Sequence, residues 1–223
     1  MTGVQTCALP IYTAFAPISL VAINPQILTS HVSLPVKTAR DLIALARVRP
    51  GQIIYSSAGV GATSHMATEL FLNMAKVKMS HVPYKGGGPS FQALMSGETA
   101  LSFVDAITVA PHAKAGRLRA LATSTLKRTP LMPEIPTVHE SGLPNFESVT
   151  SFGMFAPTGT PRDIIGKVHR EVTRALASSD VKDKLKALGV DPVGSTPEEL
   201  VTHQKQETAK WGKVVREQGI KFE

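Results

Sequence analysis

Two short glycine-rich segments hold the residues of this sequence that are best suited to binding chemistry. The first glycine turn, Tyr55–His65, reads YSSAGVGATSH, and the second glycine turn, His81–Pro89, reads HVPYKGGGP. Each leads into a helical pattern, so its backbone N–H groups would lie unpaired at the positive end of a helix dipole. Such a turn holds a carboxylate or another small anion without a catalytic side chain. Neither turn has a nucleophile and its base nearby in the sequence, which favours a receptor over an enzyme.

Common catalytic and metal-binding motifs do not fit these residues. The first glycine turn lacks the lysine of a P-loop, and neither Ser57 nor Ser64 lies in a Gly-x-Ser-x-Gly elbow. The seven histidines show no metal-ligand spacing. We therefore expect no catalytic residue, no metal site and no cofactor. His65, one turn inside its helix, either faces the bound ligand or packs against a neighbouring element.

The composition is that of a globular protein of one or two lobes, with 43% hydrophobic residues. Aromatic residues make up 5%, too few for the base-stacking platforms of single-strand binding proteins. The net charge of +7 serves either solubility or the attraction of anions and acidic surfaces. Because the lysines and arginines are dispersed, we expect no nucleic-acid binding. No apolar run is long enough to span a membrane.

Strand and helix patterns alternate along the chain, which predicts a parallel or mixed sheet with helices on both faces. Strands expected at 52–55, 79–82 and 100–104 lead into the first glycine turn, the second glycine turn and Asp105. Ligands of such sheets bind beyond the carboxyl ends of the strands, so these segments would gather at one edge. Asp105 would there accept a hydrogen bond from a ligand hydroxyl or ammonium, or else cap the next helix.

The remaining elements follow from periodicity and capping signals. Four prolines between Thr129 and Pro144 mark a connector with one short helix after Thr137. Thr196 and Glu199 form a capping box for the last helix. Further strands are expected at 15–23, 26–30, 118–123 and 146–155, and helices at 38–48, 63–76, 90–96 and 107–115, then from 161, from 179 and from 196 to 215.

The order of these motifs resembles the periplasmic solute receptors of tripartite tricarboxylate transporters, the Bug-type receptors. The similar segments are the two glycine turns, Pro111–Ala122, Ile135–Pro144 and Phe155–Pro161, within a resemblance that runs from about Tyr12 to the C-terminus. It implies an α/β, two-lobed, periplasmic binding protein type II-like fold. It also implies a periplasmic, monomeric receptor that captures a di- or tricarboxylate, an acidic amino acid or a related organic acid. Its partners would be the membrane permease subunits of the transporter.

The resemblance also implies which residues bind the ligand. Backbone amides and hydroxyls of the first glycine turn would meet a ligand carboxylate, and the Tyr84 hydroxyl would donate to the ligand. Asp105 departs from the family pattern, which often has an aspartate one position earlier, where this chain has Val104. The expected ligand-binding residues are Ser57, Gly59, Gly61, Thr63, Ser64, Tyr84, Gly86 and Asp105.

The start of the chain does not fit the family. Residues 3–11 back-translate closely to a common sequencing adapter, which indicates that residues 1–11 are an artefact; a natural N-terminal arm is the alternative. The family's first strand and its glycine-rich loop with an aspartate have no match in residues 1–14. The N-terminal part of the first lobe would therefore be missing. We expect residues 12–22 and 149–223 to form the remainder of lobe 1, and residues 23–148 to form lobe 2.

An enzyme is the alternative function. An α/β enzyme, such as a transferase, could use the glycine-rich turn as its anion site, and the fold class alone does not decide between the two. The sequence offers no paired acid and base in support of it. Ligand-induced thermal stabilisation by carboxylates separates the alternatives.

Overall fold

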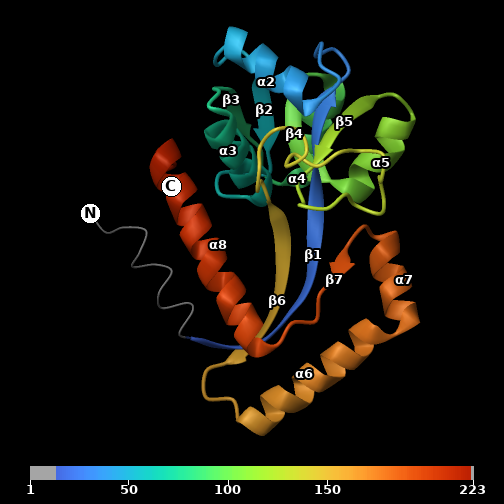
Figure 1. Cartoon of the computed structure of the whole chain (residues 1–223), viewed down its shortest axis with the longest axis vertical. Coiled ribbons are helices and arrows are strands. Elements are labelled where there is room, and N and C mark those ends of the chain that lie inside the picture. Colours follow the sequence, from blue (N-terminus) through green and yellow to red (C-terminus); the bar gives the residue numbers. More distant parts are fainter. Residues whose placement is uncertain (1–13, 222–223) are drawn as a thin grey trace. The chain divides into compact units, whose positions relative to one another are not determined.

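The computed structural model describes residues 14–221, so the artefact predicted at residues 1–11 lies outside the described residues. The described chain divides into two compact units (Figure 1). Unit 1 contains residues 14–23 and Ser151–Ala209, and unit 2 contains Asn24–Thr150 and residues 210–221. The last helix thus contributes its final residues to unit 2, whereas the sequence-based boundaries assigned them to lobe 1.

Unit 2 is built on a mixed sheet in the order β3-β2-β4-β1-β5. β2 is parallel to its neighbours β3 and β4, while β1 is antiparallel to β4 and β5. The strands are β1 (Phe15–His31), β2 (Ile54–Ser57), β3 (Ser80–Pro83), β4 (Leu101–Asp105) and β5 (Leu118–Thr123), and the helices are α2 (Ala39–Val48), α3 (Thr63–Ala75), α4 (Gly87–Ser96) and α5 (Ala106–Lys114). The mixed sheet and the helix after each parallel strand confirm the predicted α/β class.

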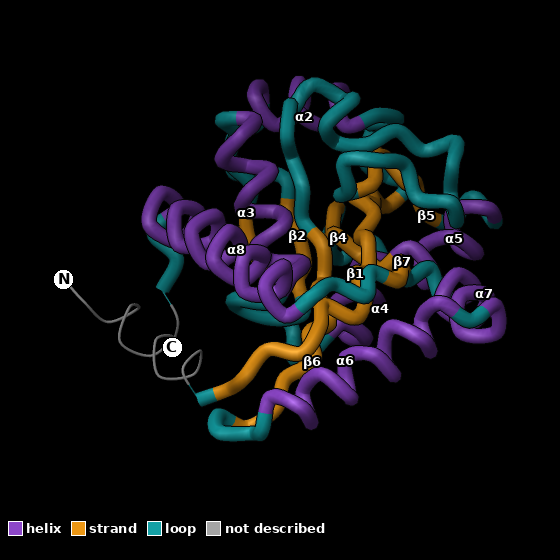
Figure 2. Tube along the Cα trace, turned by 60° about the horizontal axis from the view of Figure 1, so that its bottom comes forward, coloured by secondary structure: helices purple, strands orange, loops and turns teal. Residues whose placement is uncertain are grey.

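Helices cover both faces of this sheet (Figure 2). Leu28 packs in the larger core with α2 and α3, while its neighbour Ile27 packs in a second cluster with α5. Successive strand residues point to opposite faces, so α3 and α5 lie on opposite sides. Phe146 anchors the larger core, where its ring stacks on Phe103 at 5.9 Å between centroids and meets the edge of Phe71 at 6.4 Å.

β1 is one continuous strand, and the prediction of two strands separated at Asn24 and Pro25 was wrong. The pairing explains the difference. β1 pairs with β7 through Ile23 and with β4 from Gln26 onward. Pro25, which has no N–H to donate, therefore lies where the strand changes partner and needs no break.

Unit 1 contains the first half of β1 and a mainly helical segment. Ser195 ties the two together: its carbonyl accepts from Ser19 Oγ at 2.8 Å, and its Oγ accepts from Leu20 N at 2.9 Å. The predicted capping box opens the last helix, with Thr196 N donating to Glu199 at 2.8 Å and Glu199 N to Thr196 Oγ1 at 3.1 Å. The elements are β6 (Val149–Pro157), α6 (Arg162–Ala177), α7 (Ser179–Ala187), β7 (Asp191–Pro192) and α8 (Pro197–Gln218).

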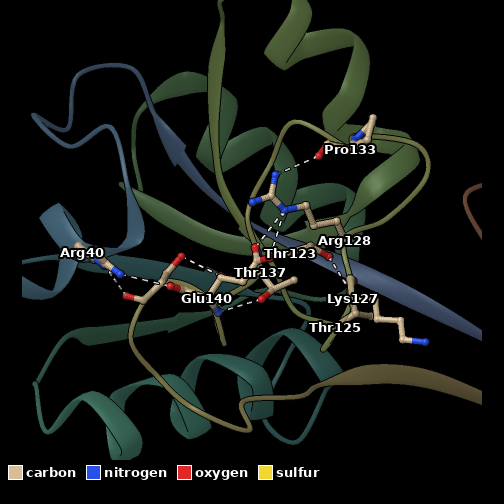
Figure 3. A network of polar contacts seen from close by, with 9 residues as sticks. Arg40, Thr123, Thr125, Lys127, Arg128, Pro133, Thr137 and Glu140 are labelled. Carbon is tan, nitrogen blue, oxygen red and sulfur yellow. Dashed lines mark hydrogen bonds and ion pairs between the residues drawn. The ribbon is translucent and has the colours of Figure 1, made fainter.

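The proline-rich connector is held against the sheet by polar contacts (Figure 3). Glu140 accepts from Thr137 N at 2.8 Å and pairs with Arg128 at 3.0 Å, while Arg40 donates to the Glu140 carbonyl at 3.3 Å. Thr137 therefore caps a turn, and the short helix predicted after it does not form. Thr123 N donates to the Pro136 carbonyl at 2.8 Å, which fixes the connector beside β5.

The aromatic core generates a stability prediction for unit 2. Phe146→Ala should lower the free energy of unfolding by about 3–5 kcal/mol, because it removes a fully buried ring between two others. Urea unfolding monitored by circular dichroism measures this loss. Val48→Ala is the control, since Val48 is 75% exposed and should change the value by less than about 0.5 kcal/mol. Equal effects of the two substitutions would contradict this core.

Candidate functional site

The parallel strands of unit 2 bring the segments predicted to bind a ligand to one edge of the sheet. Ser57 pairs with Pro83, and Tyr55 pairs with Leu101, so β2, β3 and β4 run in the same direction. Their carboxyl ends therefore lead into the first glycine turn, the second glycine turn and Asp105 at the same edge. β1 adds Gln26, which lies directly opposite Asp105 in the antiparallel ladder.

The two glycine turns are bonded to each other. Tyr84 N donates to the Ser57 carbonyl at 3.0 Å, and Gly86 N donates to the Ala58 carbonyl at 3.0 Å. Gly59 and Gly86 have φ values of 132° and 110°, which side-chain-bearing residues rarely adopt. The glycines thus allow two backbone segments to approach closely and to act as one rigid edge.

Several amides of the first glycine turn are satisfied internally. Ala58 N donates to Ser64 Oγ at 3.0 Å, and Gly59 N donates to Ser57 Oγ at 3.2 Å. Gly61 N donates to Nδ1 of His65 at 3.1 Å. These bonds use groups that the sequence analysis expected to point toward a ligand. These internal bonds fix the backbone of the first glycine turn, which leads directly into the start of α3.

The first amides of α3 remain available. The N-cap residue, Ala62, supplies no side-chain hydrogen bond, and the first turn contains no acidic residue. Within the described residues, the backbone N–H groups of Thr63 and Ser64 have no partner. Since Ser64 is buried and Thr63 is half-buried, these donors are partly desolvated, and donors of this kind at a helix start are suited to an anion.

Three described helices lack both a side-chain cap and an acidic first turn, and all three begin at this edge. They are α3, α4 and α5, which begin after the parallel strands. By contrast, α2 has a complete capping box with Thr38 and Asp41, and α6, α7 and α8 each have an acidic residue in the first turn. Among the described helices, α3 and α4 therefore begin without an acidic side chain at their positive ends, beside the glycine turns, and the nearest carboxylate of α5 is that of its N-cap residue, Asp105.

Asp105 and Gln26 add a polar pair to the same edge. Asp105 occupies the N-cap position of α5 but makes no capping bond, so the expected capping role is not observed. Burial raises the pKa of its carboxyl, and a hydrogen bond from the Gln26 side chain opposes this shift. Gln26 is 6% exposed, and its Oε1 has no partner among the described residues. Gln26 Oε1 is therefore a buried acceptor at this edge whose hydrogen-bonding capacity the described residues leave unused.

A stack of three rings lies behind the first glycine turn. The rings of His65 and His81 are 4.1 Å apart at 14°, and Tyr55 stacks on the other side of His81 at 4.8 Å and 15°. His81 Nε2 lies 2.7 Å from Ser57 Oγ, and the Tyr55 hydroxyl donates to Glu69. Burial lowers the pKa of His65 and, together with the charge of His65, lowers that of His81 to about 4. Both imidazoles are therefore neutral near pH 7.

Tyr84 is oriented differently from the prediction. Its hydroxyl donates to the exposed Glu98 carboxylate at 2.8 Å, so in this conformation it is engaged by the protein rather than directed to a ligand.

No cluster of three metal-ligating side chains occurs in the described part of the chain. None of the described helices is both long and apolar enough to cross a membrane.

Residues 9–220 match the family described as the tripartite tricarboxylate transporter family receptor. The chain belongs to this receptor family. BugT of Bordetella pertussis is 34% identical to this chain over 92% of this chain and 63% of its own length. The chain thus spans less than two thirds of the length of BugT and of most of the other curated relatives that it matches.

Solved structures of other proteins share the fold. Rpa4515 of R. palustris, determined with adipate, is 36% identical, has a TM-score of 0.84, and matches 94% of this chain over 70% of its own. MatC of Rhodopseudomonas palustris, determined with malate, is 30% identical with a TM-score of 0.77, over 90% of this chain and 69% of its own. These similarities confirm the predicted periplasmic binding protein type II-like fold.

The sequence patterns did not predict every residue that the structure places at or behind this edge. Gln26 was missed, although a glutamine inside an otherwise apolar strand is a recognisable signal. Tyr55, Glu69 and His81 were also missed. The spacing of His65 and Glu69, one helical turn apart on a buried face, was the only local sign of their contact.

The pKa shifts of two aspartates predict opposite effects of neutralisation. The folded-state pKa of Asp105 is raised above its ordinary value of 3.8, so its stabilising contribution is lost as the pH rises. Asp105→Asn should therefore increase the melting temperature at pH 7, and the gain should shrink as the pH falls toward 3.8.

Asp41 provides the control of opposite sign. Hydrogen bonds from Lys37 N and from Thr38 lower its pKa, so its contribution is present above the ordinary pKa and is lost at lower pH. Asp41→Asn should lower the melting temperature at pH 7. Thermal unfolding at a series of pH values measures both, and a loss of stability in Asp105→Asn at pH 7 would contradict the burial cost assigned to this carboxylate.

Proposed function

We propose that this chain is an extracytoplasmic solute-binding receptor that captures a small carboxylate for delivery to a tripartite tricarboxylate-type membrane transporter. The observation that carries the proposal is the uncapped start of α3 beside a buried, unsatisfied Gln26, in a chain of this receptor family. Backbone N–H groups at a helix start bind a carboxylate without a fixed counter-charge. The receptor would work in the periplasm as a monomer, with the permease subunits as partners.

In this proposal, the predicted site residues divide into those that touch the ligand and those that shape the turns. Thr63 and Ser64 donate backbone amides to a ligand carboxylate, and Asp105 accepts from a second ligand group. The others set the backbone path or join the two turns by hydrogen bonds, and they are Ser57, Gly59, Gly61, Tyr84 and Gly86.

The acceptors at the edge suggest the ligand class. Adipate in Rpa4515 and malate in MatC are both dicarboxylates, but only malate carries a hydroxyl donor. Here Gln26 Oε1 has no donor among the described residues, and the Asp105 carboxylate, which accepts from the Gln26 side chain, keeps further acceptor capacity. A dicarboxylate with a hydroxyl or ammonium group would satisfy them, whereas adipate would leave a buried acceptor unpaired. We therefore favour a hydroxy- or amino-dicarboxylate.

The hydrogen bond between Ser57 and His81 is also the starting point for the enzymatic alternative. A serine 2.7 Å from a histidine is the geometry of a nucleophile and its base. However, Ser57 is fully buried, and its Oγ also bonds to the backbone N and O of Gly59. The lowered pKa of His81, about 4, makes it a weak base. These features support a structural role of the pair in a receptor without catalytic activity.

Ligand-induced stabilisation tests the proposed class. Malate, aspartate and other dicarboxylates should raise the melting temperature in a concentration-dependent way, with adipate weaker and a neutral diamide ineffective. Differential scanning fluorimetry across this panel measures the shifts, and isothermal titration calorimetry gives the dissociation constants. The absence of any carboxylate effect, or an equal effect of the diamide, would contradict the proposal.

A substitution at Thr63 tests the amide site itself. Thr63→Pro removes one N–H at the first helical position, where proline is well tolerated. Ala62, with φ −63° and ψ 156°, already has a conformation that can precede proline. Affinity for malate should fall about tenfold or more, because a charge-assisted hydrogen bond is lost. Thr63→Val, which loses the hydroxyl but keeps the amide, is the control; the same affinity in both variants would exclude the amide.

A further inference from the structure

We propose that His65 and His81 are positioning residues, which as a stacked, uncharged pair hold the first glycine turn in the shape that binds a carboxylate. This inference rests on the proposed function and extends it to residues that do not touch the ligand. Each ring makes one hydrogen bond that leads into the turn, and the two rings support each other by stacking 4.1 Å apart.

The bond of His65 determines its protonation. Nδ1 accepts from the backbone N–H of Gly61 at 3.1 Å, so the proton of the neutral ring lies on Nε2, which is 3.7 Å from Glu69. A doubly protonated imidazole could not accept from Gly61. Because Gly61 has φ 81° and lies two residues before Thr63, the bond fixes the last bend before the free amides of α3.

The bond of His81 acts on the other end of the turn. Its Nε2 lies 2.7 Å from Ser57 Oγ, and the same oxygen accepts from Gly59 N at 3.2 Å. Gly59 has φ 132°, a conformation that requires such support. Thus one ring sets the path through Gly59 and the other sets the path through Gly61.

The groups around the pair keep it uncharged. His65 faces His81 of β3 and Glu69 on its own helix, and His81 also faces Tyr55 of β2. The Glu69 carboxylate is engaged by the Tyr55 hydroxyl, and burial raises its pKa. Two imidazolium rings at the observed separation would repel each other with little solvent to screen the charges. Burial accordingly lowers the pKa of both rings.

Acidification should therefore release the turn. A histidine whose folded-state pKa is lowered destabilises the folded form as the pH falls from its ordinary value of 6.5 toward the folded-state value, about 4 for His81. The raised pKa of Glu69 acts in the opposite direction. Loss of the Gly61 bond on protonation would leave the start of α3 without a fixed approach, so carboxylate affinity would fall across this range.

A crossed set of substitutions separates the hydrogen bonds from the packing. Asparagine places an amide oxygen near Nδ1 of histidine, and glutamine places an amide group near Nε2. For His65, whose Nδ1 is the contact atom, His65→Asn should bind malate within about threefold of the unaltered chain, and His65→Gln should bind about tenfold more weakly. For His81, whose Nε2 is the contact atom, the order reverses. His81→Gln should keep its affinity for malate, and His81→Asn should bind malate more weakly.

The design contains its own controls. All four variants lose the ring stack, so a purely packing role predicts equal loss within each pair, which would overturn the inference. Malate affinity of the unaltered chain should also fall between about pH 6.5 and 4. The double variant His65→Asn with His81→Gln has no imidazoles at these positions, so its malate affinity should fall less over the same pH range. The two chains are compared at each pH, so the protonation of malate is the same in both measurements and does not affect the difference. An unchanged pH profile in the double variant would likewise overturn it.

A measurement without ligand separates this inference from the proposed function. Hydrogen exchange of the Gly61 amide, followed by NMR, should be slow in the unaltered chain and in His65→Asn, and at least about tenfold faster in His65→Gln, since only that variant lacks an acceptor. Equal exchange in the two variants would overturn the inference even if malate binds. If the Gly61 amide exchanges slowly in His65→Asn and fast in His65→Gln, but the unaltered chain binds no carboxylate, the proposed function and the role of the histidines in binding are both overturned.

Discussion

The unpaired backbone N–H groups at the start of α3 are the feature on which the site depends. A helix start normally acquires a side-chain cap, and this chain supplies one elsewhere, at Thr38 of α2 and Thr196 of α8. At the edge of the parallel strands, Ala62 provides none. The uncapped start lowers the stability of the free protein, because a partly desolvated donor lacks its bond. A carboxylate can accept that bond. The missing side-chain cap therefore lowers the stability of the free protein and leaves donors available for a ligand.

Free amides bind a ligand only if the turn before them is rigid. The amides of Ala58, Gly59 and Gly61 are used for that purpose, through bonds to Ser64, Ser57 and His65. The supporting side chains are buried, and burial favours neutral groups, which explains why imidazoles and hydroxyls rather than charged residues surround the turn. Two ring nitrogens thus complete the backbone structure that leads to the free amides of α3, to which we assign the binding function.

Local sequence signals were sufficient for much of the fold. The capping box at Thr196, the helical pattern that begins at Thr38 and the glycine turns placed the helix starts within a few residues of their observed positions. Contacts distant in sequence could not be predicted this way. The continuity of β1 through Pro25 depends on a change of partner from β7 to β4, and the use of the Gly61 amide depends on the rotamer of His65. The Gln26 and Asp105 pair likewise follows from strand register, which no local pattern encodes.

A carboxylate at the edge of an anion site has a consequence for selectivity. Asp105 repels an anionic ligand that presents only oxygens to it, and its buried position makes that repulsion stronger than it would be in water. A ligand with a hydroxyl or ammonium group near its carboxylate turns the same residue into a hydrogen-bond acceptor. Gln26, with a carbonyl oxygen lacking a partner in the described chain, favours the same ligands. In the proposed receptor, attraction at the start of α3 and repulsion at Asp105 would together select a molecule with an acceptor and a donor a short distance apart, because unfavourable contacts discriminate between ligands as well as favourable ones.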